Sequence, residues 1–296
     1  MQERDFLLAI HLTKGLGRTK EARVIEAIQT GRMKRHYPWS KAALGFVLYG
    51  GHISAKDWAL FENYDKAIQE VEHSLDVQVA REPFITYFDA AYPEMLRQSY
   101  QPPLILFYRG DLRSLQLPLV SVVGTRTATH YGLKALRKLL PEVIENGVGI
   151  VSGLAKGIDV MAHQITISAG GVPIGVVAAG LNRSYPYVNH LIQQEVSQQG
   201  LLLSEYPADT LAHRGHFPER NRIIAGLSSV TLVVEAKHKS GSLITANLAL
   251  QNNREVMAVP GSIFSLESVG CNELIEAGSL PACSASAIMR AVKLIN

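Results

Sequence analysis

Apolar, strand-like runs recur at a nearly constant interval in the second half of the chain, and this repeat constrains the fold more than any other feature. The runs begin near Leu119, Val148, Pro173, Leu201, Val230 and Glu255. By subtraction the intervals are 29, 25, 28, 29 and 25 residues, and each contains a helical segment. This spacing is typical of strand–helix–strand units, and near-continuous apolar strands indicate a sheet buried on both faces. We predict an α/β fold with a doubly wound, mostly parallel sheet and right-handed crossovers over residues 79–296.

The residues before this repeat have helical periodicity. We expect helices near residues 3–12, 19–30, 40–49, 54–61 and 65–75, which together form a small all-α domain over residues 1–78. In the mixed region 78–110, prolines interrupt any long helix and residues 104–108 are typical of a buried strand. Helices near 272–277 and 285–294 are expected to close the second domain.

Composition excludes several protein classes. The chain has 296 residues, of which 47% are hydrophobic and 19% charged, as in ordinary globular proteins. The net charge of +3 is small, so a polyanion would have to bind a local cluster of cations. Cys271 and Cys283 cannot form a disulfide framework and lack metal-ligand spacing, so we expect two small hydrophobes and no metal. No signal peptide or stretch of eighteen apolar residues is present, which predicts a cytoplasmic location.

Turn-forming residues and a cation follow the first predicted strand. Gly124 and Thr125 permit a tight turn, Arg126 supplies a guanidinium, and Thr127 or Thr129 can cap the next helix. Free N–H groups beside a guanidinium would bind an anion. The alternative is a capped helix with a solvated arginine. Because carboxyl ends of parallel strands share one edge of the sheet, later loops should join this site.

The next loops carry further candidates. The second strand ends at Ser152 and Gly153 and leads to a glycine turn at the start of a helix. Asp159 and His163, four residues apart, resemble a catalytic pair, but a structural carboxylate near a helix N-terminus is the favoured interpretation. The loops after the third and fourth strands add cations and aromatic rings, namely Arg183, Tyr185, His213, Arg214 and His216.

The stretch 217–246 contains several of these candidate features together: an aromatic ring, cations and a helix start after a strand. Phe217 is expected to be an exposed ring beside cations, with a hydrophobic staple as the alternative. If a helix begins near residue 218, Arg220 shares the stripe that packs on the sheet and leans into the crevice. Arg222 lies about 200° further around the helix, which favours a structural ion pair.

Residues 237–245 are predicted to form a second phosphate-contacting loop. Its candidates are Lys237, Lys239, Ser240 and Gly241, although the Walker A spacing is missing. No dinucleotide fingerprint and no nucleophile elbow follow any strand, so we expect no cofactor and no enzyme activity. Cations with an aromatic ring favour binding a phosphate backbone and stacking a base.

A glycine turn near the N-terminus has two interpretations. Residues Lys14 to Arg18, KGLGR, resemble a helix-hairpin-helix, whose glycine amides hold a DNA phosphate. The small apolar residue Ala22 falls one place later than in that motif. A plain turn between packed helices fits equally well.

Several long motifs together resemble the DNA-processing protein A family (DprA, also called Smf). They are SVVGTR, IVSGLAKGID, FPERNRIIAGLS, VVEAKHKSGSLITA and REVMAVPGS, and the resemblance covers residues 87 to 296. It implies an extended Rossmann-like domain preceded by a domain similar to a sterile alpha motif. It also implies a homodimeric mediator of natural transformation, which protects incoming single-stranded DNA and helps load a RecA-type recombinase.

The resemblance also implies roles for individual residues. It assigns Arg126 to phosphate binding, Phe217 to base stacking, and Arg214, Arg220 and Asn221 to the same site. Some members have a lysine where this chain has Tyr187, which puts one phosphate contact in doubt. The winged-helix domain of many members is not expected here. We expect the dimer interface around Leu274, Leu280, Ile288 and Met289.

Two enzymatic alternatives remain open at this point. Rossmann-like relatives include nucleotide hydrolases of the phosphoribohydrolase type, so base release from a nucleotide is the main alternative function. A dinucleotide-dependent oxidoreductase is disfavoured by the missing fingerprint.

Overall fold

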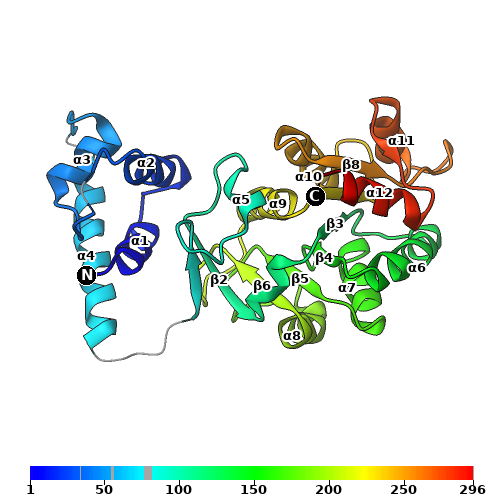
Figure 1. Ribbon diagram of the computed structural model, residues 1–296, viewed down its shortest axis with the longest axis horizontal. Coiled ribbons are helices and arrows are strands. Elements are labelled where there is room, and N and C mark those ends of the chain that lie inside the picture. The colour runs from blue at the N-terminus through cyan, green and yellow to red at the C-terminus, as the bar shows by residue number, and fades with distance from the viewer. Residues whose placement is uncertain (34, 55–56, 77–81, 296) are drawn as a thin grey trace. The chain divides into compact units, whose positions relative to one another are not determined.

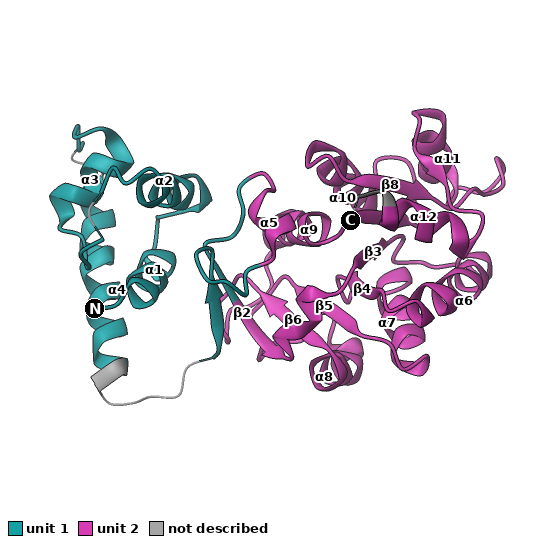
Figure 2. Ribbon diagram, in the orientation of Figure 1, with its two compact units in different colours: residues 1–92, 101–106 teal, residues 93–100, 107–296 magenta. Residues whose placement is uncertain are grey.

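Residues 1–33, 35–54, 57–76 and 82–295 are described by the computed structural model of the protein. The chain divides into two units, residues 1–92 with 101–106 and residues 93–100 with 107–296 (Figure 2). The domain boundary predicted between residues 78 and 79 falls in segment 77–81, outside the described residues, so it stays a prediction.

Helices form most of the first unit. They are α1 (Glu3–Leu12), α2 (Arg18–Gln29), α3 (Lys41–Tyr49) and α4 (Trp58–Asp76), and the short strand β1 (Phe84–Thr86) follows them. The predicted break between helices at 54–61 and 65–75 is wrong, because one helix, α4, runs from Trp58 to Asp76. Residues 55–56 of the first predicted helix lie outside the described residues. No glycine or proline interrupts residues 58–76. Phe61, Tyr64, Ala67 and Val71 recur every three or four residues and, with Leu60, are buried as one continuous stripe.

The glycine turn at residues 14–18 joins α1 to α2. Gly15 has φ of +91°, a conformation that glycine adopts without steric cost. Leu16 is buried, and Asn63 of α4 donates a hydrogen bond of 3.0 Å to the carbonyl of Lys14. The turn is thus packed within the unit, and phosphate binding there stays a prediction.

Parallel strands form the centre of the second unit. The strands are β2 (Ile105–Gly110), shared with the first unit, β3 (Leu119–Val123), β4 (Gly149–Ser152), β5 (Pro173–Val177), β6 (Leu201–Ser204), β7 (Val230–Val233), β8 (Glu255–Ala258) and β9 (Leu280–Pro281). Their order in the sheet is β2-β6-β5-β4-β3-β7-β8-β9. Neighbours from β6 to β9 pair in parallel, and β2 pairs antiparallel with β6. The predicted mostly parallel α/β fold is confirmed.

Helices cover both faces of this sheet (Figure 1). Contacts link α12 (Ala285–Ile295) to α6 (His130–Glu145), α6 to α7 (Ile158–Ser168), and α7 to α8 (His190–Gln199) along one face. On the other face, α9 (His216–Leu227) packs on α10 (Gly241–Gln251) and on the short α5 (Glu94–Arg97). The remaining elements are α11 (Val269–Glu276) and the 3₁₀ turns η2 (Leu112–Gln116) and η3 (Tyr187–Asn189).

The chain reverses its direction of travel across the sheet between β3 and β7. From β3 it moves outward through β4, β5 and β6, and β7 then returns to the other side of β3. The loops after β3 and β7 therefore separate toward opposite faces. Sheets of this kind bind their ligands at such a reversal, outside the carboxyl ends of the strands.

The C-terminal residues predicted to form a dimer interface differ in exposure. Leu280 is 44% exposed, Met289 is partly buried, and Leu274 is nearly buried. Ile288 is 0% exposed and belongs to the apolar core beneath α6 and α12. Its side chain therefore supports α12 from inside, whereas Leu280 is available to a partner. The interface itself stays a prediction.

No helix in the described ranges is long and apolar enough to cross a membrane.

The burial of Ile288 predicts a stability effect. Ile288→Ala should lower the free energy of unfolding by about 2–5 kcal/mol, because it removes packed methyl groups and leaves a cavity. Urea unfolding followed by circular dichroism would measure the loss, which should not depend on protein concentration. Leu250→Ala, at an exposed site of α10, is the control and should change stability by about 0.5 kcal/mol or less. A concentration-dependent loss in Ile288→Ala would instead place the residue at an interface.

Candidate nucleic-acid interface

A cavity of about 470 Å³ lies at the reversal between β3 and β7. Segments that are far apart in the sequence line it, as predicted for the shared edge of the sheet. It brings together most of the predicted site residues, namely Gly124, Thr125, Arg126, Phe217, Arg220, Asn221, Lys237, Ser240 and Gly241. Thr127 and Asp159 also line it. Four of the predicted residues do not, namely Ser152, Gly153, Arg214 and Lys239.

A second cavity of about 270 Å³ shares Arg126, Phe217 and Arg220 with the first. Lys156, from the loop after β4, and Tyr185, from the loop after β5, contribute to its wall. Tyr185 is one of the candidates that the sequence placed at this edge, whereas Lys156 was not selected as a site residue. The predicted residue Gly153 also lines this second cavity.

Phe217 is the ring common to both cavities. Its ring centroid lies 5.4 Å from that of Tyr185, with the planes tilted by 57°. The guanidinium carbon of Arg126 lies 5.5 Å from the Phe217 centroid, within the range of a cation–π interaction. Phe217 is half-buried rather than fully exposed. The site therefore combines an aromatic surface with an exposed positive charge.

Arg220 is part of the floor of this site. Its side chain is buried, and its guanidinium donates hydrogen bonds to the carbonyls of Gly153 and Val176, the latter at 2.6 Å. Its Nε donates to Asn221 Oδ1 at 3.1 Å. Burial lowers the pKa of Arg220, and nearby Asp159 opposes that shift. Arg220 reaches the crevice as predicted, but much of its hydrogen-bonding capacity is used by the backbone, and DNA contact stays a prediction.

Ser152 and Gly153 have structural functions beneath the cavity. The Ser152 hydroxyl is buried and donates to the carbonyl of Val122 at 2.6 Å. A side chain at Gly153 would overlap the guanidinium of Arg220. Both residues therefore fix the strand ends and the position of Arg220. Arg214 and Lys239 are exposed on their loops.

Asp159 and His163 are buried on α7. The Asp159 carboxylate accepts a long hydrogen bond of 3.4 Å from the Ala155 amide, and its pKa is raised by burial against the effect of Arg220. Burial, with the charge of Arg220 nearby, lowers the pKa of His163 to about 4. Asp159 lines the first cavity, whereas His163 lines neither of the two. These observations favour the structural interpretation of the carboxylate.

The expected anion site at the start of α6 is already occupied by the chain itself. Thr129 caps the helix, as predicted, and accepts from the amides of Tyr131 and Gly132. The Thr129 amide donates to Glu235 Oε2 at 2.9 Å, and its hydroxyl donates to the other carboxylate oxygen. A side chain at Gly132 would overlap this carboxylate. The prediction of free amides here is wrong, because a buried residue after β7 supplies the anion.

A second internal carboxylate, that of Glu267, contacts the loop after β7. Lys237 Nζ lies 3.0 Å from Glu267 Oε1, and the Thr127 hydroxyl donates to the same oxygen at 3.1 Å. Ser240 precedes α10, and its hydroxyl lies 2.8 Å from that of Ser242. Sequence reasoning missed Glu267, because it lies between β8 and α11 and only the tertiary fold brings it here.

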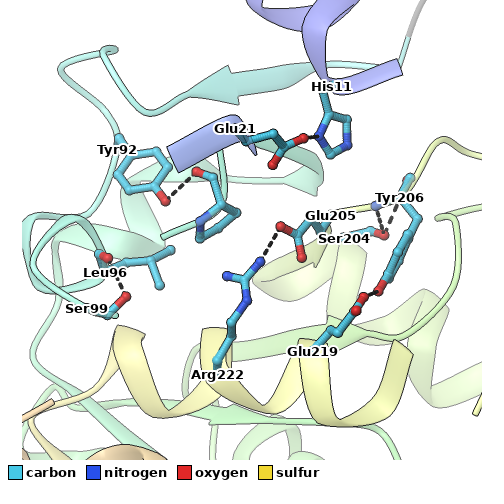
Figure 3. A network of polar contacts seen from close by, with 11 residues as sticks. His11, Glu21, Tyr92, Leu96, Ser99, Ser204, Glu205, Tyr206, Glu219 and Arg222 are labelled. Carbon is cyan, nitrogen blue, oxygen red and sulfur yellow. Dashed lines mark hydrogen bonds and ion pairs between the residues drawn. The ribbon is translucent and has the colours of Figure 1, made fainter. Parts of the chain in front are cut away.

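Arg222 forms the structural ion pair that the helical phase predicted. It pairs with Glu205, just after β6, and both side chains are buried (Figure 3). Beside it, the Tyr206 hydroxyl donates to Glu219 Oε2 at 2.7 Å (Figure 3). These contacts fix α9 against the end of β6 and so position Phe217 at the helix start.

No group of metal-ligating side chains is present within the described ranges. Burial raises the pKa of the Cys271 thiol to about 12, and Cys283 is exposed.

Comparisons with known proteins agree on one family. The family model described as DNA recombination-mediator protein A matches residues 83–293. DNA processing protein DprA of Streptococcus pneumoniae is 44% identical over 197 residues, which are 67% of this chain and 70% of that protein. The Bacillus subtilis protein of the same name is 45% identical over 198 residues, or 67% of each chain. Protein Smf of Synechocystis is 37% identical over 281 residues, covering 94% of this chain and 69% of that one.

Solved structures extend the agreement to the whole chain. The X-ray structure of DNA processing protein A from Streptococcus pneumoniae has a TM-score of 0.87 at 33% identity and covers 98% of both chains. A Helicobacter pylori structure of DNA processing protein A, described as showing its single-stranded DNA binding mode, has a TM-score of 0.64 at 30% identity. It covers 73% of this chain and 99% of that one.

The buried ion pair predicts a large effect of single substitutions. Arg222→Leu should destabilise the protein by about 3–5 kcal/mol, because it leaves the Glu205 carboxylate buried without the Arg222 guanidinium. Guanidinium unfolding would measure the loss. Arg222→Leu combined with Glu205→Leu should recover much of it, since no unpaired charge remains. A loss in Arg222→Leu no larger than that of Arg113→Ala, in an exposed pair, would contradict the assignment.

Buried His163 predicts a pH dependence of stability. Its folded-state pKa of about 4 lies below the ordinary 6.5, so the unfolded chain binds more protons between these values. Its contribution to stability is therefore complete above about pH 6.5 and is lost as the pH falls toward 4, by about 3 kcal/mol in total. Unfolding of His163→Leu and wild type at several pH values should show a weaker pH dependence in the variant. Equal slopes would show that His163 is not buried in its neutral form.

Proposed function

This chain belongs to the DNA recombination-mediator protein A family, and from that premise we propose that it binds single-stranded DNA at the cavity between β3 and β7. The observation that carries the proposal is the Arg126–Phe217 pair, a cation and an aromatic ring in contact on the wall shared by both cavities. A nucleotide offers the complementary groups, a phosphate for the guanidinium and a base for the ring. The Helicobacter pylori relative, described by its single-stranded DNA binding mode, supports the same ligand.

Exposed cations around the ring would hold the phosphate backbone. Arg126, Lys156 and Lys237 are exposed and come from the loops after β3, β4 and β7. Each phosphate that they neutralise releases counterions, so affinity should fall steeply with salt. The small net charge of +3 means that this local arrangement, rather than a global field, attracts the strand.

The site favours an unpaired base. Phe217 and Tyr185 present ring surfaces within a pocket, and a base can stack there only when its face is free of a neighbouring base pair. Stacking of this kind tolerates any sequence, since every base has a π-face. We therefore infer binding with little sequence preference.

Binding without bond cleavage is the better-supported activity. Asp159, the carboxylate that lines the first cavity, lies near the buried Arg220 and accepts a hydrogen bond from the Ala155 amide. Such a group is held in place rather than poised to activate water. The phosphoribohydrolase alternative would be supported by release of free base from nucleoside monophosphates, and we expect none.

The remaining parts of the proposal concern partners and setting. We infer that the protein acts in the cytoplasm during natural transformation, protects incoming single strands and helps load a RecA-type recombinase. Family membership supports these roles. We also infer a homodimer, for which exposed Leu280 offers an apolar contact near the C-terminus. Light scattering at micromolar concentration would test the dimer.

The cavity geometry predicts different effects for its cation and its ring. Arg126→Ala should remove one phosphate contact and reduce the slope of log K against log salt by about 0.7. Phe217→Ala should weaken binding by about 1–3 kcal/mol through lost stacking, with the slope unchanged, because the number of charges stays the same. Fluorescence anisotropy of a labelled oligothymidine at several salt concentrations measures both quantities.

Matched controls show whether these effects come from the cavity or from the loss of any exposed cation or ring. Arg137→Ala removes an exposed cation of α6, and Tyr100→Ala removes an exposed ring; neither residue lines the two cavities. Both controls should bind like the wild type. The proposal would be contradicted if DNA binding did not depend on salt. It would also be contradicted if every variant bound duplex DNA as strongly as single-stranded DNA.

A further inference from the structure

Glu267 places a negative charge against two residues that line the first cavity, Thr127 and Lys237. Its Oε1 accepts from the Thr127 hydroxyl at 3.1 Å and lies 3.0 Å from Lys237 Nζ. Thr127 and Lys237 both line the first cavity, and both are exposed. A hydroxyl and an ammonium that converge on one oxygen form the arrangement that binds a phosphate oxygen.

The backbone holds this carboxylate in position. The Ala236 amide donates to the Glu267 carbonyl at 2.7 Å, and the Gly270 amide donates to the Ala236 carbonyl at 2.7 Å. The side chain of Glu267 is 14% exposed. Burial opposes ionisation, but hydrogen bonds from Thr125, Lys237 and Thr127 outweigh it and lower the pKa of Glu267, so the group is charged at neutral pH. The loop before α11 thus delivers a fixed negative charge to the site.

We propose that Glu267 is an internal competitor of DNA, which holds Thr127 and Lys237 in place of a backbone phosphate and thereby sets the affinity of the site. The proposal rests on the proposed single-stranded DNA binding. Lys237 contacts a phosphate only after it exchanges Glu267 for that phosphate. The strand therefore gains less from Lys237 than from Arg126, whose guanidinium lies over a ring.

The exchange has a measurable signature in the salt dependence. In the wild type, Lys237 is already neutralised by the chain, so its transfer to DNA releases few counterions. Glu267→Gln keeps the shape of the side chain and removes its charge. Lys237 then binds phosphate as a free cation, which should steepen the salt slope by about 0.7. Affinity for single-stranded DNA should rise roughly threefold to tenfold at low salt.

Lys237→Ala tests whether the gain in DNA affinity of Glu267→Gln depends on the lysine. In the wild-type background this substitution should not raise DNA affinity and should change the salt slope little, because Glu267 keeps its negative charge at the site. In the Glu267→Gln background it should abolish the gain in affinity and in slope. Such non-additivity is the mark of residues that act through one contact.

Glu273→Gln is the matched control. Glu273 lies on α11, six residues further along, and its carboxylate pairs with exposed His238 at 2.7 Å. This variant makes the same change in net charge without touching Thr127 or Lys237. If Glu267→Gln and Glu273→Gln raised DNA affinity equally, the effect would be one of net charge and the proposal would be overturned.

A readout without DNA separates this inference from the proposed function. Inorganic pyrophosphate should raise the thermal unfolding midpoint of Glu267→Gln more than that of the wild type or of Glu273→Gln, since ligand binding stabilises the folded state. If the wild type failed to bind single-stranded DNA while pyrophosphate stabilised Glu267→Gln selectively, the proposed function would fail, and Glu267 would compete with a phosphate ligand other than DNA. If the wild type bound DNA but Glu267→Gln behaved like Glu273→Gln in both assays, the competitor would be overturned.

Discussion

Parallel pairing of β3 with β7 is the interaction on which the candidate site depends. Val120 to Val123 pair in register with Val230 to Val233, so the two strands end at the same level of the sheet. The strands are separated by about a hundred residues of sequence, and their loops nevertheless open into one cavity. Backbone hydrogen bonds of the sheet thus fix the distance between Arg126 and Lys237. The backbone of the sheet thus sets the spacing of the loops, and the side chains on those loops determine the chemistry of the cavity.

Internal carboxylates explain much of the electrostatic character of this edge. Glu235 holds the start of α6, Glu267 holds Thr127 and Lys237, and Glu205 holds Arg222. Glu235 and Glu267 act on groups that sequence patterns alone would leave open to an external anion, whereas the helical phase had predicted an ion pair for Arg222. At α6 the consequence is that the helix N-terminus, where dinucleotide-binding Rossmann folds place a pyrophosphate, is closed by the chain's own carboxylate. The exposed cations around Phe217 are therefore the groups that we propose for phosphate binding.

Predictions from periodicity were accurate where one period dominated a segment. The six strands of the repeat lie within one residue of their predicted starts, because each is a continuous apolar run bounded by turns. Strands β1 and β9 were not predicted, since three and two residues are too short to show any pattern. Helix α4 was divided in error at polar residues that lie on its exposed side, while its buried stripe continues without a break. A doubly wound sheet was predicted, but the position of its reversal between β3 and β7 was not, because pairing between distant strands leaves no local signal.

The sequence by itself determined the α/β class, the positions of its main strands, the loops that gather at one edge and the family of the chain. It also determined that Arg220 and Arg222 face different surroundings, since helical geometry separates neighbouring positions on the same helix. Tertiary structure alone decided what each arginine meets: backbone carbonyls at the ends of β4 and β5 for Arg220, and Glu205 for Arg222. It alone brought Glu235 and Glu267 to the site. The physical reason is that local periodicity reports which face of an element is buried, whereas partners distant in sequence are chosen by the packing of the whole sheet.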